Sequence, residues 1–394
     1  MKISVIIVNY QVARFTRQAV QALLAQEGDV ALEVFVVDNA SADNSLAYLR
    51  THFPAAAFPQ IHIIDAGSNL GFSRANNLAA QQATGDYILF LNPDTIPAEN
   101  LLVQLLEFAE LHTDAGAVGV SMTNDDGTFA PESRRGLPTP WTAFCKMAGL
   151  TAVFPTSRLF GRYYMAYMPS DRPHATEVVS GACMMVRNDG RKAWFDTDYF
   201  MYGEDIDLSY RLMQEGKTNY YVPALLIHFK GESTNKTSYR YAHVFYGAML
   251  VFLRKHFPHY AFWLRPIIYA AIAAKALKGW LNGLCVSLNY RFKRHKVWLQ
   301  PRAAYFGSHG ERFQKCADDL AWRTTIHRVN AEGHTTEDVA QYDFVVYDIA
   351  DYTRCAIIRL LQQSAGKVRL ALYDNATGEI IFHGAENGRK LQHQ

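Results

Sequence analysis

The stretch SVIIVNYQVARFTRQAVQALLAQEGDVALEVFVVDN (residues 4–39) decides the fold class, because it has the pattern of a strand, a helix and a strand. Its two apolar runs, 4–10 and 33–39, are rich in β-branched residues and flank a segment with helical spacing over 14–26. Neither run alternates strictly between apolar and polar residues, so both strands are expected to be buried on two faces. The stretch therefore predicts a parallel sheet with helices packed on both sides.

The same alternation continues along most of the first 230 residues. Further strands are predicted at 61–67, 87–94, 115–122, 177–187 and within 220–234. Helices are predicted over 41–53, 72–83 and 98–111 and in a segment that ends at Gly216. Residues 123–175 break the pattern and are rich in proline, glycine and aromatic residues. Loops of this length inside a domain are usually functional, so this segment is expected to cross the open side of the sheet.

The chain becomes aromatic and basic between about 238 and 290. Helices are predicted over 244–257 and 262–288, and the second is nearly apolar enough to span a membrane. Arg265, Lys275 and Lys278 interrupt it, and a charge at the bilayer centre costs roughly 3 kcal/mol on insertion scales. A helix that lies in the membrane interface, anchored by tryptophans, fits this pattern better, and a pair of ordinary core helices is the alternative.

The tail from about 300 to 394 is expected to form a separate small α/β unit. Strands are predicted at 302–308, 324–329, 344–349, 368–374 and 379–384, and a helix over 352–366. The tail carries no catalytic pattern, which leaves partner binding or a scaffold role. The predicted organisation is a catalytic domain over 1–240, a helical segment at the membrane interface over 241–298, and a C-terminal α/β domain over 299–394.

Composition excludes several classes of protein. Apolar residues make up 49% of the 394 residues and charged residues 19%, which indicates a folded protein. The net charge of +2 gives no field that would argue for a nucleic-acid partner. The five cysteines are scattered, so a reducing compartment is expected rather than a disulfide framework or a zinc site. The first apolar run is short and β-branched, unlike a secretory signal.

Polar residues follow several of the predicted strands, where ligands sit in doubly wound sheets. Asp38 can accept a hydrogen bond from a ribose hydroxyl or a base, or it can form a local turn with Ser41. Gly71 permits a tight turn before a helix whose free N–H groups favour anions, and Arg74 can add donors to a diphosphate. A capped helix with an arginine in solvent is the alternative reading of that segment.

Three further acids and one histidine stand out. Asp94 follows a strand beside Pro93, where a carboxylate can hold a divalent cation or make a turn. Glu204 and Asp205 begin a helix, and both cannot be caps because adjacent residues face different ways. One of them could accept a proton from a sugar hydroxyl. His228 ends an apolar strand, and imidazole is a common metal ligand, although a lone histidine is more often structural.

Seven motifs, in this order, resemble glycosyltransferase family two with the GT-A fold. The resemblance is strongest to the rhamnosyltransferase-like subgroup that builds bacterial cell-surface polysaccharides, and it spans about residues 1–260. The motifs are SVIIVNY (4–10), VDNASADNS (37–45), NLGFSRANN (69–77), FLNPDT (90–95), SGACMMVR (180–187), FMYGEDIDLSYRL (200–212) and IHFKGES (227–233). The family implies a mixed, Rossmann-like sheet followed here by amphipathic helices and the small C-terminal α/β domain.

The resemblance also implies roles for the matching positions. Nucleotide-sugar contacts are implied for Asn9, Tyr10, Asp38, Asn69, Gly71, Arg74 and Asn92, and a donor-sugar pocket for Ser180, Gly181 and Ala182. Asn92 and Asp94 match the end of the family's metal-binding D-x-D, with asparagine replacing the first acid, which leaves fewer charged ligands. His228 matches a distant metal ligand, for Mn²⁺ or Mg²⁺. Asp205 matches the catalytic base, and Glu204 would hold the acceptor.

We therefore expect an inverting glycosyltransferase that uses a nucleotide-diphosphate sugar, with dTDP-rhamnose favoured, and a glycan or lipid-linked acceptor in cell-envelope biosynthesis. The expected location is the cytoplasmic face of the inner membrane, as a peripheral protein. Two other functions stay open at this point: a non-catalytic protein that binds nucleotide sugars as a scaffold, and a glycosidase whose two carboxylates would be Asp94 and Asp205.

Overall fold

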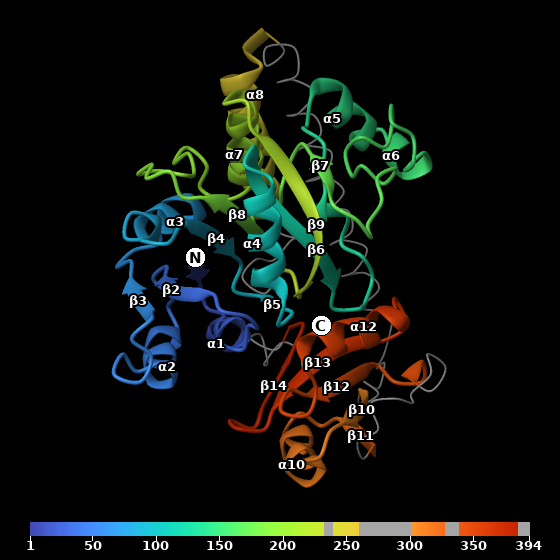
Figure 1. Ribbon diagram of the computed structural model, residues 1–394. Coiled ribbons are helices and arrows are strands. Elements are labelled where there is room, and N and C mark those ends of the chain that lie inside the picture. The colour runs from blue at the N-terminus through green and yellow to red at the C-terminus, as the bar shows by residue number, and fades with distance from the viewer. Residues whose placement is uncertain (232–238, 260–300, 328–338, 385–394) are drawn as a thin grey trace.

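The first apolar stretch lies inside a mixed sheet in the computed structural model, which describes residues 1–231, 239–259, 301–327 and 339–384. Nine described strands form this sheet: β1 (Lys2–Asn9), β2 (Ala31–Asp38), β3 (Ile61–Asp65), β4 (Tyr87–Leu91), β5 (Thr95–Pro97), β6 (Ala115–Asn124), β7 (His174–Thr176), β8 (Cys183–Arg187) and β9 (Thr218–His228). Their order is β3-β2-β1-β4-β8-β6-β9-β5, and β7 pairs with β9 (Figure 1). β1 to β4 are parallel, whereas β8 runs antiparallel to both of its neighbours.

Helices cover both faces of this sheet. The helices of this unit are α1 (Ala13–Leu24), α2 (Ser45–His52), α3 (Phe72–Ala80), α4 (Leu101–Leu111), α5 (Pro140–Met147), α6 (Leu150–Val153), α7 (Glu204–Gln214) and α8 (Tyr239–His256), with a short 3₁₀ turn η1 (Pro131–Ser133), and α5 and α6 project away from the sheet (Figure 1). Successive side chains of β1 point to opposite faces, so Val5 and Ile7 pack with α1 and α4, while Ile6 and Val8 pack with α3 and α7. Both sets are buried, which explains the continuous apolar run.

A second sheet forms the C-terminal unit. Its elements are β10 (Arg302–Phe306), α10 (Gly310–Asp319), β11 (Arg323–His327), β12 (Phe344–Asp348), α12 (Arg354–Gln363), β13 (Arg369–Asp374) and β14 (Glu379–Phe382). The strand order is β11-β10-β12-β13-β14, and the last pair is antiparallel. In Figure 1 this unit lies at the end of the molecule that carries α1 and β5.

The two units share a buried interface. Arg17 of α1 is 1% exposed and pairs with Asp374 at 2.7 Å and with Glu379 at 2.8 Å, both in the C-terminal unit. The Glu99 carboxylate accepts hydrogen bonds from the first two backbone N–H groups of α12, at 2.6 and 3.0 Å. Phe229, which directly follows β9, packs into the apolar core of the C-terminal unit. The C-terminal unit therefore supports the end of β9, where His228 lies.

The predicted mixed α/β architecture is confirmed, with differences in detail. The strand predicted over 177–187 is only β8, because Gly181 turns its N–H to Asp205 instead of to a neighbouring strand. The segment 123–175 contains α5, α6 and β7, and α10 was not predicted. The predicted helix over 262–288 and most of the 241–298 segment lie outside the described residues. In the part of the chain that the structure describes, no helix is both long and apolar enough to cross a membrane.

Candidate active site

The predicted nucleotide contacts begin where β1 and β2 end side by side. Asn9 and Asp38 are partners in the parallel register, and Nδ2 of Asn9 donates to Oδ1 of Asp38 at 2.7 Å. Ser41 also donates its backbone N–H and its hydroxyl to Asp38, at 3.0 and 2.7 Å. The local turn that the sequence left open is therefore present. Tyr10 lies beside this group and is half-buried. A nucleotide contact for these residues stays a prediction.

The start of α3 has the tight turn that its glycine predicts. Gly71 has φ +78°, and a Cβ added there would lie 2.6 Å from the backbone oxygen of Phe200, so a larger residue would clash. Asn69 accepts hydrogen bonds from the Asn39 side chain and from the N–H of Gly71, each at 3.1 Å. Arg74 is exposed and has no hydrogen-bond or ion-pair partner among the described residues. Both a free arginine and an arginine positioned for a diphosphate are compatible with this geometry.

Asp94 and His228 meet, as the predicted metal pair requires. Nε2 of His228 lies 3.3 Å from Oδ1 of Asp94, and both side chains are buried. β5 pairs antiparallel with β9 in a register that places Thr95 opposite His228, and the N–H of Phe229 donates to the backbone oxygen of Asp94 at 2.9 Å. The pairing of two short strand ends therefore brings these two distant positions together.

The donor set of this pair fits a divalent cation. Two ligand atoms on adjacent positions of an octahedral ion, each at about 2.1 Å, would lie about 3 Å apart, close to the 3.3 Å separation of Asp94 and His228. Nδ1 of His228 is buried and has no partner among the described residues, so the imidazole is not committed to another contact on that side. An oxygen and an imidazole nitrogen suit Mn²⁺ better than Ca²⁺.

A larger group of potential metal ligands lies in the C-terminal unit. His309, Asp348 and Asp351 place one ligand atom each within 4.8 Å of one another, next to the ends of β10 and β12. Nδ1 of His309 lies 2.9 Å from Oδ2 of Asp348, which also accepts a hydrogen bond from Tyr305 at 2.9 Å. This group belongs to the second sheet and was not predicted, so the structure offers two places for a cation.

The predicted base, Asp205, is held at the start of α7 by three donors. Its Oδ2 accepts hydrogen bonds from the backbone N–H of Gly181 at 3.2 Å and from the guanidinium of Arg135. Its Oδ1 accepts from the N–H of Ile206 at 2.8 Å. Burial opposes the charge of Arg135, but Asp205 outweighs this effect and raises the pKa of Arg135 above its ordinary value. The bond from Gly181 orients this carboxylate toward the segment 180–182.

Glu204 is in a different electrostatic state from Asp205. Its side chain is buried, and its Oε2 has no hydrogen-bond partner among the described residues. Burial, with the neighbouring charge of Asp205, raises the pKa of Glu204 from 4.5 to about 8. At neutral pH this carboxyl is therefore mainly protonated and can donate a hydrogen bond, whereas Asp205 is an acceptor. Two adjacent acids with different protonation states can divide the tasks of holding and deprotonating a hydroxyl.

A short chain of contacts connects the base to the predicted metal pair. Gly181 bonds to Asp205, and the next residue, Ala182, accepts a hydrogen bond from the N–H of Asn92 at 2.9 Å. Asn92 is two residues before Asp94. The three segments that carry the predicted base, the donor-sugar pocket and the metal pair therefore lie side by side at one end of the strands of the sheet.

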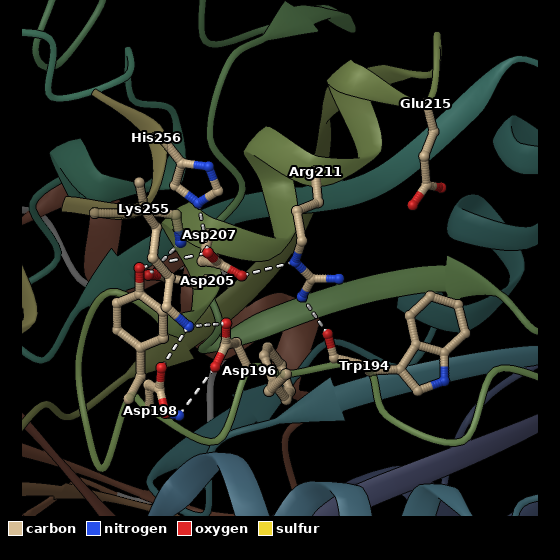
Figure 2. Close-up of polar contacts among 12 residues, drawn as sticks. Trp194, Asp196, Asp198, Asp205, Asp207, Arg211, Glu215, Lys255 and His256 are labelled. Carbon is tan, nitrogen blue, oxygen red and sulfur yellow. Dashed lines mark hydrogen bonds and ion pairs between the residues drawn. The ribbon is translucent and has the colours of Figure 1, made fainter. Parts of the chain in front are cut away.

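Helix α7 is fixed from behind by α8 and by the loop before it. Figure 2 shows His256 and Lys255 of α8 pointing toward acidic residues: His256 lies 2.7 Å from Asp207, and Lys255 pairs with Asp196 and Asp198. Arg211 also pairs with Asp207, at 2.7 Å. Asp207 is fully buried in this network. It therefore holds α7, the helix that carries the predicted base, in place.

Comparison with known proteins identifies the family of the first part of the chain. Residues 4–190 match the model of Glycosyl transferase family 2. This segment of the chain is a family 2 glycosyltransferase domain. The matched residues contain the predicted nucleotide contacts and Asp94, while Glu204, Asp205 and His228 lie beyond them.

Relatives of this glycosyltransferase include rhamnosyltransferases. The chain is 27% identical over 292 residues to the N-acetylglucosaminyl-diphospho-decaprenol L-rhamnosyltransferase of Mycobacterium tuberculosis, an alignment that covers 68% of this chain and 88% of that protein. It is 30% identical to the rhamnosyltransferase WbbL of Escherichia coli K12, over 42% of this chain and 62% of WbbL. The predicted rhamnosyltransferase-like family is thereby confirmed.

Solved structures that resemble part of this chain include a mannosyltransferase and TarS. The mannosyltransferase PcManGT of Pyrobaculum calidifontis, solved with GDP-Man and Mn²⁺, is 16% identical with a TM-score of 0.44, over 74% of this chain and 81% of that one. TarS of S. aureus, residues 1–349 with UDP, is 16% identical with a TM-score of 0.41, over 64% and 66% of the two chains.

The sequence reasoning missed one residue of this glycosyltransferase's site. Arg135 was not singled out, although it bonds directly to Asp205. It lies in the sequence SRR (133–135), and an arginine pair in a long loop of a catalytic domain was the available signal. Its neighbour Arg134 is buried and lies over the rings of Phe129 and Tyr221, at 5.0 and 6.0 Å from their centroids. Only the structure distinguishes the two arginines.

Proposed function

We propose that this glycosyltransferase moves a hexose, with rhamnose from dTDP-rhamnose favoured, to a hydroxyl of a lipid-linked or polysaccharide acceptor, with inversion at the anomeric carbon. The observation that carries the proposal is the bond from Gly181 to Asp205. It fixes a carboxylate to the segment that the family resemblance assigns to the donor-sugar pocket. A base for an inverting displacement has to stand on the acceptor side of that sugar, within reach of the attacking hydroxyl.

Each residue has a separate role in the proposed reaction. Asp205 accepts the proton of the attacking hydroxyl, and the hydrogen bond from Arg135 keeps this carboxylate oriented until then. Glu204, protonated at neutral pH, donates a hydrogen bond to the acceptor. Asp94 and His228 would hold the cation. A bound Mn²⁺ or Mg²⁺ supplies positive charge that offsets the charge gathering on the leaving diphosphate.

The relatives support the choice of donor and acceptor. The name of the M. tuberculosis relative describes transfer of L-rhamnose to an N-acetylglucosaminyl diphosphate lipid, and that alignment covers 88% of the relative. A lipid-linked acceptor in cell-envelope synthesis would bring this enzyme to the cytoplasmic face of the inner membrane as a peripheral protein. The helical segment 241–298 would contribute to that attachment.

A transfer assay with the full chain tests this function. Nucleoside diphosphate release would be measured with dTDP-rhamnose, UDP-GlcNAc or GDP-Man, with and without a synthetic N-acetylglucosaminyl diphosphate lipid. We expect acceptor-dependent release from dTDP-rhamnose above all, and none from Asp205→Asn. Donor binding without transfer to any acceptor would favour a scaffold. Release of sugar from a polysaccharide without any nucleotide would favour the two-carboxylate glycosidase.

A further inference from the structure

An exposed aromatic surface projects from the catalytic domain. Of the ten large apolar side chains that are exposed among the described residues, five lie between 141 and 159. We call them the aromatic patch: Trp141, Phe144, Val153, Phe154 and Leu159. Their exposed fractions run from 46% to 68%. Exposed aromatic groups gathered in one place mark a binding surface, whereas single exposed apolar residues need no explanation.

The members of the aromatic patch are held together rather than scattered. The ring of Trp141 lies 5.7 Å from that of Phe144 and 6.2 Å from that of Phe160, centroid to centroid, and Phe154 lies 5.6 Å from Phe160. The indole N–H of Trp141 donates to the backbone oxygen of Leu159 at 3.1 Å. α5, α6 and the turn after them therefore present a single preformed surface. In Figure 1 both helices stand at the end of the molecule away from the second sheet.

The charged residues of the segment that carries the patch are all basic. Residues 137–170 contain no aspartate or glutamate, but they contain Lys146, Arg158 and Arg162. Arg162 pairs with Glu177, whereas Lys146 and Arg158 have only tyrosine partners among the described residues. Basic residues beside exposed tryptophan and phenylalanine are the pattern of a surface that lies in the headgroup layer of an anionic membrane.

A second acid-free stretch of the chain lies after the catalytic domain. Residues 233–310 contain twelve lysines and arginines and no acidic residue. α8 is the first element of that stretch, and it stands at the same end of the molecule as α5 in Figure 1. Within α8 the basic residues Arg254 and Lys255 are exposed, and Lys255 pairs with Asp196 and Asp198.

The patch is also joined to the acceptor side of the active site. The segment that carries it begins just after Arg135, which bonds to Asp205. Its far end returns beside the same place, where the backbone oxygen of Tyr163 accepts a hydrogen bond from the N–H of Gly136 at 3.2 Å. A surface bound at the patch would therefore be close to the carboxylate that is expected to receive the acceptor's proton.

We propose that the aromatic patch docks this enzyme on an anionic lipid bilayer and so presents the base to an acceptor held in that bilayer. The inference assigns membrane contact to α5 and α6 of the catalytic domain, in addition to the segment 241–298. The role of this docking in the reaction rests on the proposed lipid-linked acceptor. Binding of the patch to a bilayer is itself independent of donor, metal and transfer.

Vesicle binding by the full chain tests the proposal without any nucleotide or acceptor. Vesicles of pure phosphatidylcholine and vesicles with about one third phosphatidylglycerol would be sedimented with the wild type, with Phe144→Ser/Phe154→Ser and with the matched control Leu111→Ser/Leu320→Ser. Leu111 and Leu320 are exposed leucines outside the patch. We expect the patch variant to lose about tenfold or more in affinity for the anionic vesicles and the control to bind as wild type.

A second pair of variants tests the charge. Lys146→Gln/Arg158→Gln should weaken binding to the anionic vesicles and leave the weaker binding to pure phosphatidylcholine unchanged, with exposed Arg359→Gln as control. Wild-type binding by Phe144→Ser/Phe154→Ser would overturn the proposal. A changed oligomeric mass, or a lower melting temperature than that of the control, would also overturn it, because the patch would then be covered by a second copy or by the chain itself. Loss of transfer alone would bear only on the proposed function.

Discussion

Nε2 of His228 and Oδ1 of Asp94 are 3.3 Å apart because β5 and β9 pair in a register that sets Thr95 opposite His228. The next residue, Phe229, packs into the core of the C-terminal unit and accepts a hydrogen bond from His383 at its backbone oxygen, at 3.0 Å. The position of one predicted metal ligand thus depends on contacts from both units. This arrangement makes the metal pair the first place to test.

Removing the metal ligands should remove the effect of metal on donor binding. Nucleoside diphosphate with Mn²⁺ should raise the melting temperature of the wild type, by an amount equal to about 2.7 kcal/mol of stabilisation at a hundred times the dissociation constant. EDTA, Asp94→Asn or His228→Gln should abolish most of this shift. His309→Gln, in the C-terminal group, is the matched control and should retain it. Loss of the shift in His309→Gln alone would place the cation in the C-terminal unit.

Asp205→Asn should abolish transfer while leaving the donor bound. An amide cannot accept the acceptor's proton, and general-base catalysis contributes roughly 10²–10⁴-fold. The amide keeps the size of the side chain, so the hydrogen bond from Gly181 is retained. The rate of nucleoside diphosphate release and the thermal shift with donor would be measured on the same protein. Transfer at the wild-type rate would show that another group is the base.

Arg135 should act on the rate of transfer and not on donor affinity. Its guanidinium bonds to the base and not to the predicted nucleotide contacts. Arg135→Gln should therefore lower kcat by about tenfold or more, with the KM for donor nearly unchanged, while Arg135→Lys should recover part of the rate because it keeps the charge. A rise in donor KM with kcat unchanged would mean that Arg135 binds the donor instead.

The contribution of Glu204 to the free energy of unfolding should fall as the pH rises. Because burial and Asp205 raise the pKa of Glu204 to about 8, the folded protein binds this proton more tightly than the unfolded chain does. The contribution of Glu204 to the free energy of unfolding is therefore greatest below about pH 4.5 and falls as pH rises to about 8. Glu204→Gln should gain stability relative to the wild type between pH 5.5 and 8.5 in urea unfolding. The exposed Glu107→Gln should show no such trend.

Breaking the buried ion pair between the units should destabilise the protein. Arg17→Met leaves the carboxylates of Asp374 and Glu379 without their guanidinium, and removal of one partner of a buried pair costs roughly 3–5 kcal/mol. The free energy of unfolding would be measured with urea, with exposed Arg359→Met as the control. A loss below about 1 kcal/mol would mean that the two units are held together chiefly by their apolar contacts.

Much of the fold was predictable because its signals are local. The apolar runs of β1, β2 and β4 and the helical spacing of α1 and α4 are visible in short windows, since burial on two faces demands continuous apolar residues. α10 was missed because its sequence is mostly polar, with Phe313 and Ala317 as its only buried residues. α5 and α6 were missed for the opposite reason: their apolar residues face outward, which no rule of core packing anticipates.

By itself, the sequence determined the family, the order of the elements and the short list of acids and histidine that can carry the chemistry, because motif spacing and apolar periodicity are properties of the chain alone. Only the tertiary structure decided that Arg135 rather than Arg134 meets Asp205, that burial raises the pKa of Glu204 and that Asp94 lies against His228. Pairing of distant strands, burial and the proximity of charges set these features, and none of them is encoded in a local window of residues.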